Sequence, residues 1–409
     1  MSAQTPVSKQ WVTRYGLMYL GQNVAWAGPT QILLALQVLH QIPDRKEFAF
    51  AILMTVGGLF QALGGFFGGV LSDRTRTRWG RRHPWIIAGS LVAVVMLGLL
   101  APSPSYPVLM VVWAVFQFAN SAGINATLAL TPDTAPASQF GLVSGIAGVT
   151  YTLGVVVGTL ASSELPTPVA YGVLAVILVI AVAQFVFWRG GRPPSNVDGT
   201  GDVLLEKMQE GRLLGGSDSA PKSYHDFIWV FAARFLVNLG NFIALFYLLY
   251  YLRDQIGVAD PDTGVLILTG IYAVCVVITA FASGVLSDRY RVRRPFVAVA
   301  SLGVAAASLM LAFVDSFAWV VAGAVVLGLS WGVFTAVDQA LVNEVLPDER
   351  RRARDVGIMN VTIAGANVLS PLMAAFALAV LGGYPGLYVM SAALVTCGTV
   401  LVYRVRSVR

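Results

Sequence analysis

Hydrophobic stretches recur along the whole chain, and each is about 20 residues long, which is enough to cross a bilayer as a helix. Twelve can be drawn, at residues 14–38, 48–71, 84–102, 106–130, 140–162, 168–188, 227–252, 264–286, 295–314, 317–342, 356–380 and 384–403. The chain is 56% hydrophobic and 12% charged, whereas soluble domains are about 25% charged. The alternating pattern of a membrane β-barrel is absent from the sequence. We therefore expect an all-α integral membrane protein with twelve transmembrane helices.

Lysine and arginine residues are distributed unevenly between the predicted loops. If the N-terminus lies in the cytoplasm, the only basic residues on the opposite side are Arg45, Lys46 and Arg253. This distribution follows the positive-inside rule. It predicts a multi-pass protein of a bacterial inner (plasma) membrane with both termini cytoplasmic. The formal net charge of +6 therefore sets the orientation and does not indicate nucleic-acid binding.

A long polar segment divides the chain into two sets of six predicted helices. It contains GGRPPSNVDGTGD and GGSDSAPKS, which are typical of flexible linkers. Residues 203–214 within it have the pattern of a short amphipathic helix at the membrane surface. We predict an N-terminal half at residues 1–189, a cytoplasmic linker at 190–225 and a C-terminal half at 226–409.

The two predicted halves share four sequence landmarks in the same order. The clearest is GVLSDR, which occurs at Gly69–Arg74 and again at Gly284–Arg289. The tripeptide IAG likewise occurs at residues 146–148 and 363–365. Because each half holds six spans, the two copies have the same orientation. We therefore expect a pseudo-twofold axis along the membrane normal.

Amide side chains are concentrated on the first, fourth, seventh, tenth and eleventh predicted spans, and every third span is almost free of polar groups. Polar groups at membrane depth must face protein or water. We therefore expect every third helix to face lipid and the others to surround a polar cavity. Hydrogen bonding between helices and ordinary aromatic packing are the alternative roles. The candidate substrate-binding residues are Gln22, Asn23, Trp26, Gln117, Asn120, Asn125, Tyr151, Asn238, Asn241, Trp331, Asn360 and Asn367.

The loop after the second span, GVLSDRTRTRWGRRHPW, combines an acid with a dense run of arginines. With the twelve spans and the repeat, it resembles the major facilitator superfamily. The order DR, RWG, basic residues and PW is similar to that of the glycoside–pentoside–hexuronide cation symporters and their sucrose-transporter relatives.

The resemblance implies that the two related loops act as latches. Asp73 would face the N-terminus of the eleventh helix when the cytoplasmic side is closed, and Asp288 would contact the fifth helix near Gly141. For the arginines, setting the topology is the alternative role. The implied gating residues are Gly69, Asp73, Arg74, Arg81, Arg82, Gly284, Asp288 and Arg289.

The second span also carries closely spaced glycines. Gly64 and Gly68 form one GxxxG pair, and Gly65 and Gly69 form another that overlaps it. Because glycine has no side chain, such pairs let a second helix backbone approach closely. We therefore expect a neighbouring helix to pack against this stretch.

The chain departs from the resembled symporters inside the membrane. Neither the second span nor the fourth contains an acid before its cytoplasmic end, so we expect no intramembrane sodium site of the melibiose type. Asn23 stands where the family carries an acid that holds sugar hydroxyls, although an amide still donates and accepts hydrogen bonds. The arginine that the family carries on the fifth span is missing.

Two charged residues remain within predicted spans, Arg234 on the seventh and Asp338 on the tenth. A charge at the centre of a membrane helix costs about 2.5–3.5 kcal/mol on insertion scales. We expect the two to pair or to reach the interface. A structural ion pair or gate is one role for them, and proton coupling through Asp338 is the other.

These observations predict a secondary active transporter that moves a small neutral organic solute by alternating access. A sugar- or glycoside-like substrate and proton coupling fit the amides and Asp338. The alternatives are an exporter of drug-like or amphipathic compounds, a lipid or lysolipid transporter or scramblase, and a membrane receptor. An enzyme is not expected, because the sequence contains neither HExxH nor a phosphate-binding loop. We expect a monomer in the lipid bilayer, without metal, cofactor or nucleic-acid partner.

Overall fold

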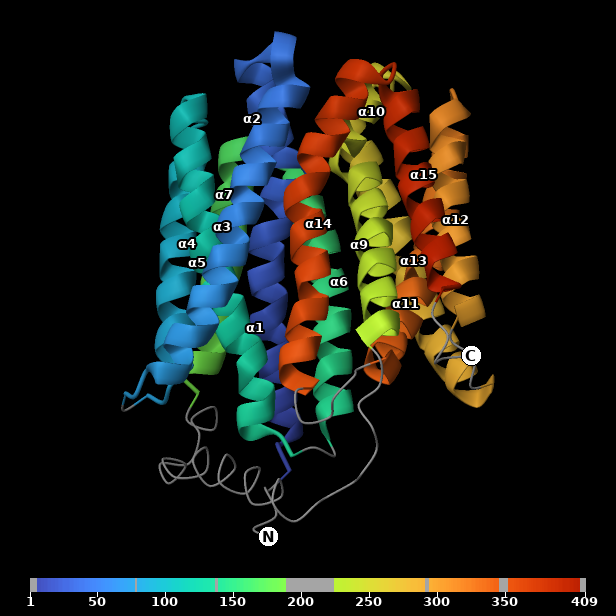
Figure 1. The fold of residues 1–409 in the computed structure, drawn as a ribbon. Coiled ribbons are helices and arrows are strands. Elements are labelled where there is room, and N and C mark those ends of the chain that lie inside the picture. The colour runs from blue at the N-terminus through green and yellow to red at the C-terminus, as the bar shows by residue number, and fades with distance from the viewer. Residues whose placement is uncertain are drawn as a thin grey trace.

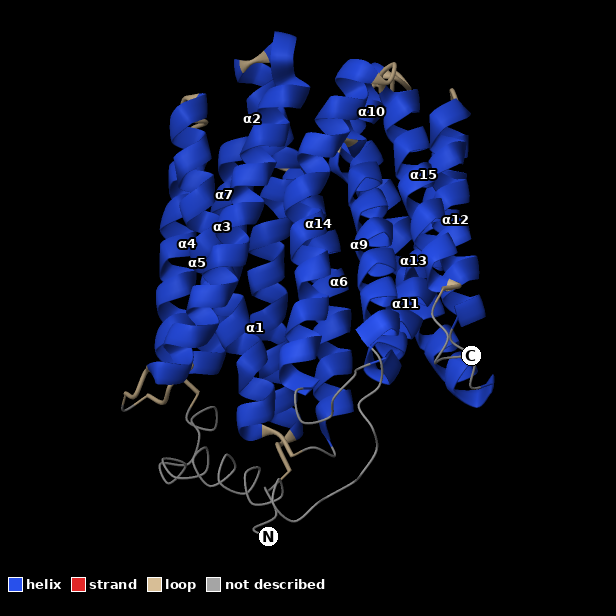
Figure 2. Ribbon diagram, viewed as in Figure 1, coloured by secondary structure: helices blue, strands red, loops and turns tan. Residues whose placement is uncertain are grey.

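The computed structural model describes residues 6–77, 79–136, 139–188, 224–290, 294–345 and 352–404. The regular elements of the described part of the chain are all helices, joined by short loops and turns (Figure 2). The first half contains α1 (Lys9–Gly28), η1 (Pro29–Leu33), α2 (Leu34–Gln41), η2 (Pro43–Arg45), α3 (Lys46–Arg74), α4 (His83–Leu100), α5 (Tyr106–Thr134), α6 (Phe140–Glu164) and α7 (Thr167–Val186). The second contains α9 (Tyr224–Phe246), α10 (Leu248–Asp254), α11 (Pro261–Tyr290), α12 (Arg294–Phe313), α13 (Phe317–Val345), α14 (Arg352–Val380) and α15 (Tyr384–Val402). The expected surface helix at residues 203–214 lies outside the described residues.

Eleven of the described helices are long and apolar enough to cross a membrane. They correspond to the second to twelfth predicted spans. The first predicted span, 14–38, is covered by α1, η1 and α2, which follow one another without a loop. The π-helical turn η1 interrupts it at Pro29, a residue that has no amide hydrogen for the regular helical ladder.

Local sequence signals explain where several helices begin. The Ser8 hydroxyl accepts a hydrogen bond from the Trp11 amide at 3.1 Å and so caps α1. Helices α4, α5, α7 and α15 each carry proline in their first turn, where the missing amide hydrogen costs nothing. The apolar interiors then hold the chain helical, because a helix satisfies its own backbone groups in lipid.

The helices run roughly side by side along one direction, and the bundle has two ends (Figure 1). We call the end where α1 begins and α15 ends the terminal end, and the opposite end, where α2 and α10 end, the far end. Helices α1 to α7 pack mainly on one another, as do α9 to α15. The main contacts between the two sets are made by α3 with α14 and by α6 with α11.

Helices α4, α7, α12 and α15 have their main packing partners within their own set. Each of the four also exposes an apolar face, with Leu91, Ile180, Val299 and Val400 among its exposed side chains. These are the third, sixth, ninth and twelfth predicted spans. Exposed apolar side chains are not confined to these four helices, because α11 also exposes Val274 and Ile278.

The glycine pairs of the second span meet α5. A Cβ atom added at Gly64 would lie 2.2 Å from the carbonyl oxygen of Phe118, and one added at Gly68 would lie 2.6 Å from the Cα of Ala122. The close helix approach predicted from these glycines is therefore confirmed. Gly69 is different, because a Cβ there would have no heavy atom within 4 Å.

Candidate functional site

A group of contacts joins the two sets of helices at the far end. The Nζ of Lys46, at the start of α3, lies 2.6 Å from Oδ2 of Asp254, the last residue of α10. The Tyr247 hydroxyl donates to the Glu47 carbonyl at 2.8 Å. The Tyr250 hydroxyl donates to the Ala35 carbonyl at the same distance. Three polar contacts therefore tie the first turns of α2 and α3 to α10 and to Tyr247, which links α9 to α10.

Aromatic packing supports these polar contacts. The Phe50 ring lies edge-on to the rings of Tyr247 and Tyr250, with centroids 5.8 and 5.6 Å away. Lys46 Nζ also lies 5.5 Å from the centroid of Tyr250, within the range of a cation–π contact. Phe50, Tyr247 and Tyr250 are fully buried. The far end is therefore closed by a packed seal that combines apolar burial with charge.

One feature of the sequence points to this seal. Lys46 is one of only three basic residues expected on that side of the membrane, so an isolated lysine there needs an acidic partner. The three tyrosines of FYLLYYLRD and the acid that ends it lie together on α9 and α10. The sequence alone does not show which of these side chains face the first set of helices, because their directions depend on how the helices pack.

A second contact between the sets lies nearer the middle of the bundle. Asn367 Nδ2, on α14, donates to Oε1 of Gln61, on α3, at 3.0 Å. Pro371 has no amide hydrogen for the Asn367 carbonyl, and the Ser370 hydroxyl donates to that carbonyl instead, at 3.3 Å. One turn towards the far end on α3, a Cβ added at Gly58 would lie 3.5 Å from the Cα of Val368. The two helix backbones therefore approach closely at this level.

Amides and aromatic side chains from both sets meet around Tyr151. The Trp26 and Tyr151 rings lie 6.4 Å apart between centroids. The Asn23 amide donates to the Tyr19 carbonyl at 2.7 Å, and the Tyr19 hydroxyl lies within electrostatic range of the Tyr151 hydroxyl. From the second set, the Tyr272 hydroxyl interacts with that of Tyr151 and lies next to the Asn241 amide. We call these six residues, Tyr19, Asn23, Trp26, Tyr151, Asn241 and Tyr272, the central cluster.

The central cluster has unused hydrogen-bonding capacity. Asn241 is 1% exposed, and neither polar atom of its amide makes a hydrogen bond of ordinary geometry. The indole nitrogen of Trp26 is also buried without an acceptor. Tyr151, by contrast, is 42% exposed. Buried polar groups usually have partners, because leaving one unpaired costs about 1–3 kcal/mol. The cluster can therefore bind a molecule that supplies donors and acceptors.

Other candidate cavity residues lie elsewhere. Gln22 is fully buried, and its amide faces Gly123 of α5. Asn125 and Asn238 donate to carbonyls of their own helices, at 2.9 and 2.8 Å. Trp331 stacks on Phe334, with centroids 5.1 Å apart. Gln117 and Asn120 are buried on α5, and Asn360 is exposed on α14.

Ion pairs of the GVLSDR loop stay within the first set of helices. Arg82 lies 2.6 Å from Asp73 and 2.8 Å from Asp133, at the end of α5. Arg81 bonds both oxygens of Asp133, at 2.7 and 3.1 Å. Asp133 thus holds two arginines, whereas the Asp73 side chain remains 59% exposed. Arg74 is exposed. The side chains of Gly284, Asp288 and Arg289 lie outside the described part.

The terminal end differs from the far end in how closely the two sets approach. Added Cβ atoms at Gly69 of α3 and at Gly141, Gly145 and Gly148 of α6 would each have no heavy atom within 4 Å. Among the described residues, the hydrogen bonds and ion pairs between the sets all involve first-set residues 35–61. The two sets are therefore joined from the far end to the middle of the bundle.

Arg234 and Asp338 form an ion pair, with Nε of the arginine 3.1 Å from Oδ2 of the acid. Both side chains are buried, at 5% and 7% exposed. They line a small cavity with Val230, Val237 and Val297, among other apolar residues of α9, α12, α13 and α15. The pair therefore lies inside the packing of the second set rather than on the central cluster.

Comparison with known proteins identifies the family. The family model described as Major Facilitator Superfamily matches residues 16–259 and 230–409, almost the entire chain. A Synechocystis sp. protein named as an uncharacterized symporter is 49% identical over 43 residues, which is 10% of this chain and 8% of that relative. The matched segment thus spans less than a tenth of that relative.

Solved structures agree at the level of the fold. A mutant of the peptide transporter POT in complex with sulfate has a TM-score of 0.76 at 13% identity, covering 98% of this chain and 96% of that chain. A mutant in complex with alafosfalin has a TM-score of 0.73 at 14% identity, covering 96% and 93%. The all-α fold predicted from the sequence is therefore confirmed. The chain is a multi-pass integral membrane protein, and it belongs to the major facilitator superfamily, a family of transporters.

Proposed function

We propose that the protein is a secondary active transporter of a small neutral organic solute, sugar- or glycoside-like, which binds at the central cluster. The carrying observation is that both sets of helices contribute uncharged amide and aromatic groups there, and that the buried Asn241 amide, beside the Tyr272 hydroxyl, makes no hydrogen bond of ordinary geometry. An amide donates and accepts at once, as sugar hydroxyls do. Tyr151 and Trp26 offer ring faces on which an apolar sugar face can pack.

The positive-inside distribution supports an orientation with the terminal end in the cytoplasm of a bacterial cell. In this orientation the far-end seal closes the outside, and we propose that the terminal end, where the described residues make no such contacts between the sets, is the open side of an inward-facing state. We propose that residues 1–189 and 226–409 move as two bodies, joined by the linker 190–225, and that the Asp73 loop latches the terminal end in the opposite state.

Proton coupling through Asp338 is the proposed driving mechanism. Asp338 and Arg234 form a buried ion pair on two helices of the second body. Protonation of Asp338 would remove its attraction for Arg234. If the pair is held differently in the inward-open and outward-open states, the proton then changes the free-energy difference between those two states, as a driving ion must. The relative named as a symporter and the RWG-type loop support a symporter related to the glycoside–pentoside–hexuronide branch.

A thermal-shift screen of the purified protein tests the substrate class. The ligands are neutral sugars and aryl glycosides, with amino acids, peptides and cationic drugs as the contrasting classes. A bound ligand raises apparent stability by mass action, by about 2.7 kcal/mol at a concentration of about 100 times its Kd. We expect neutral glycosides to raise the melting temperature. A shift given only by cationic drugs or only by peptides would overturn the assignment of a neutral solute.

A further inference from the structure

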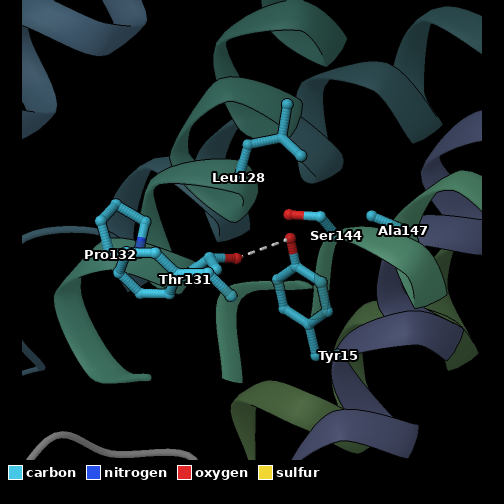
Figure 3. A pocket seen from close by; sticks show the side chains of 7 residues that line it. Tyr15, Leu128, Thr131, Pro132, Ser144 and Ala147 are labelled. Atoms are coloured by element: carbon cyan, nitrogen blue, oxygen red, sulfur yellow. Dashed lines mark hydrogen bonds between the residues drawn. The ribbon is translucent and has the colours of Figure 1, made fainter. Parts of the chain in front are cut away.

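A separate pocket of about 360 Å³ opens near the terminal end of the first set of helices (Figure 3). It lies between α1, α5 and α6, and its seven described lining residues are all uncharged. Ligand pockets typically begin at about 300 Å³. The pocket is therefore large enough for a small organic molecule.

One part of this pocket is formed by three hydroxyl groups. The Thr131 hydroxyl donates to the Tyr15 hydroxyl at 3.2 Å, so the proton of Tyr15 is left for another acceptor. The Ser144 hydroxyl points towards that of Tyr15 (Figure 3) and makes no hydrogen bond with a described residue. Tyr15 itself is 1% exposed, so its ring position is fixed by packing. These hydroxyls offer both donors and acceptors at a defined place.

The rest of the lining is apolar, except for one backbone group. Leu128, Pro132 and Phe140 supply the apolar surface. Pro132 lies inside α5 and has no amide hydrogen to give to the Leu128 carbonyl, which therefore lacks its regular helical donor. The acid that follows, Asp133, is held by Arg81 and Arg82. The pocket thus presents hydroxyls on one side and apolar groups on the other.

The pocket lies one helical turn from the central cluster on two helices. Tyr15 and Tyr19 lie one turn apart on α1, and Ala147 and Tyr151 lie one turn apart on α6. The Tyr19 hydroxyl interacts with those of both Tyr15 and Tyr151. A row of hydroxyl groups therefore leads from the pocket to the cluster, and a solute can exchange hydrogen bonds along it.

We propose that this pocket is a second binding site for the transported solute, occupied between the central cluster and the terminal end. Its ligand is a neutral molecule with hydroxyl groups at one end and an apolar body, such as an aryl glycoside. The hydroxyls contact Tyr15 and Ser144, and the apolar body packs on Leu128 and Phe140. This inference rests on the proposed function, because it assigns the same solute class to both sites.

The experiment uses cysteine protection, with 4-nitrophenyl β-D-glucopyranoside as the probe. Ser144→Cys is made in a chain carrying Cys275→Ala and Cys397→Ala, and a neutral maleimide labels the purified protein. The same variant is made with Asn241→Ala, which weakens binding at the central cluster about tenfold, and both are labelled at the same probe concentration. We expect the glycoside to slow labelling in both backgrounds, because the pocket binds it directly. Adding Tyr15→Phe should weaken this protection about five- to tenfold, the effect of one lost hydrogen bond.

The outcomes separate this inference from the proposed function. Protection that disappears with Asn241→Ala, while the wild type still binds the probe, would show that the pocket only senses occupation of the central cluster. That result would overturn the second site and leave the proposed function standing. A wild-type protein that binds neither this glycoside nor any other neutral sugar would overturn both. Equal melting temperatures with and without Ser144→Cys serve as the folding control.

Discussion

Lys46 Nζ lies 2.6 Å from Asp254 Oδ2, and this ion pair joins the first set of helices to the second at the far end. The Tyr384 hydroxyl donates to the same carboxylate oxygen at 3.1 Å, which positions Asp254 from within its own set. Phe50 and Tyr250 pack directly beneath the pair. Opening the far end must therefore break one charge contact and expose buried aromatic surface.

Removing the charge of Lys46 should favour opening of the far end. A partly exposed pair contributes about 0.2–1 kcal/mol, so Lys46→Ala should raise the population of far-end-open molecules by about 1.4- to fivefold. Labelling of Thr55→Cys in a Cys275→Ala, Cys397→Ala chain reports this, because the Thr55 hydroxyl is buried below the seal. The charge swap Lys46→Asp with Asp254→Lys should restore slow labelling. An unchanged rate in Lys46→Ala would show that the aromatic packing alone closes this end.

Asp73 and Asp133 should respond differently to loss of charge. Asp73 is largely exposed, so Asp73→Asn should change the free energy of unfolding by less than about 0.5 kcal/mol. Asp133 holds Arg81 and Arg82, so Asp133→Asn should cost about 1–3 kcal/mol. Thermal unfolding measures both.

The latch assigned to Asp73 predicts a further difference. Asp73→Asn should increase the labelling of Ser144→Cys, because the closed state of the terminal end loses an acid at a helix N-terminus. Asp44→Asn, on an exposed acid at the far end, is the matched control. Equal labelling of the two variants would show that the charged loop only sets the orientation of the chain in the membrane and does not hold the terminal end closed.

Arg234 and Asp338 test the coupling proposal. Asp338→Asn should abolish accumulation driven by a pH gradient in proteoliposomes, yet leave exchange of solute across the membrane intact. Removing one partner of a buried ion pair typically costs about 3–5 kcal/mol, so folding must be checked by thermal unfolding. The double variant Arg234→Met, Asp338→Leu removes both charges and should recover most of that stability. Undiminished gradient-driven uptake by Asp338→Asn would rule out its role as proton carrier.

The glycines of α3 give a stability prediction with a built-in control. Gly64→Ala places a Cβ 2.2 Å from the Phe118 carbonyl oxygen, so α3 and α5 must separate. Overpacking of this kind costs about 1–3 kcal/mol. Gly69→Ala meets open space and should leave the melting temperature unchanged or slightly higher. Equal melting temperatures for the two variants would contradict the close packing of these helices.

Hydrophobic length and charge distribution were enough to predict the helices, because each span must satisfy its own backbone in lipid. The exception is the first span, where Pro29 and the following π-helical turn change the helical register. Side-chain direction is harder to predict. Gln22 and Asn23 are neighbours on α1, yet Gln22 faces α5 and Asn23 packs on Gly154 of α6. Successive helical residues point about 100° apart, so a small error in helix orientation changes which amide reaches the centre.

Contacts between helices that are far apart in the chain could not be predicted from the sequence either. Tyr19 and Tyr272 belong to the central cluster but were not among the candidate residues, because the sequence does not show which face of their helices turns towards Tyr151. Arg234 and Asp338 were expected to line the cavity, yet they lie among apolar side chains of the second set. Both differences arise from packing angles between helices, which are set by many small contacts.

Transport by Asn241→Ala and Gln37→Ala proteins tests the central claim most directly. Gln37 is a buried amide with three partners, Leu100, Ser103 and Tyr171, whereas the Asn241 amide at the centre makes no hydrogen bond of ordinary geometry with the protein. The measurement is binding and proteoliposome uptake of the neutral glycoside that performs best in the thermal-shift screen. We predict that Asn241→Ala weakens binding about tenfold without lowering the melting temperature, because it removes only ligand contacts. Gln37→Ala should lower the melting temperature and keep the affinity. The opposite pattern, with Asn241→Ala unstable but binding normally, would contradict a solute site at the central cluster.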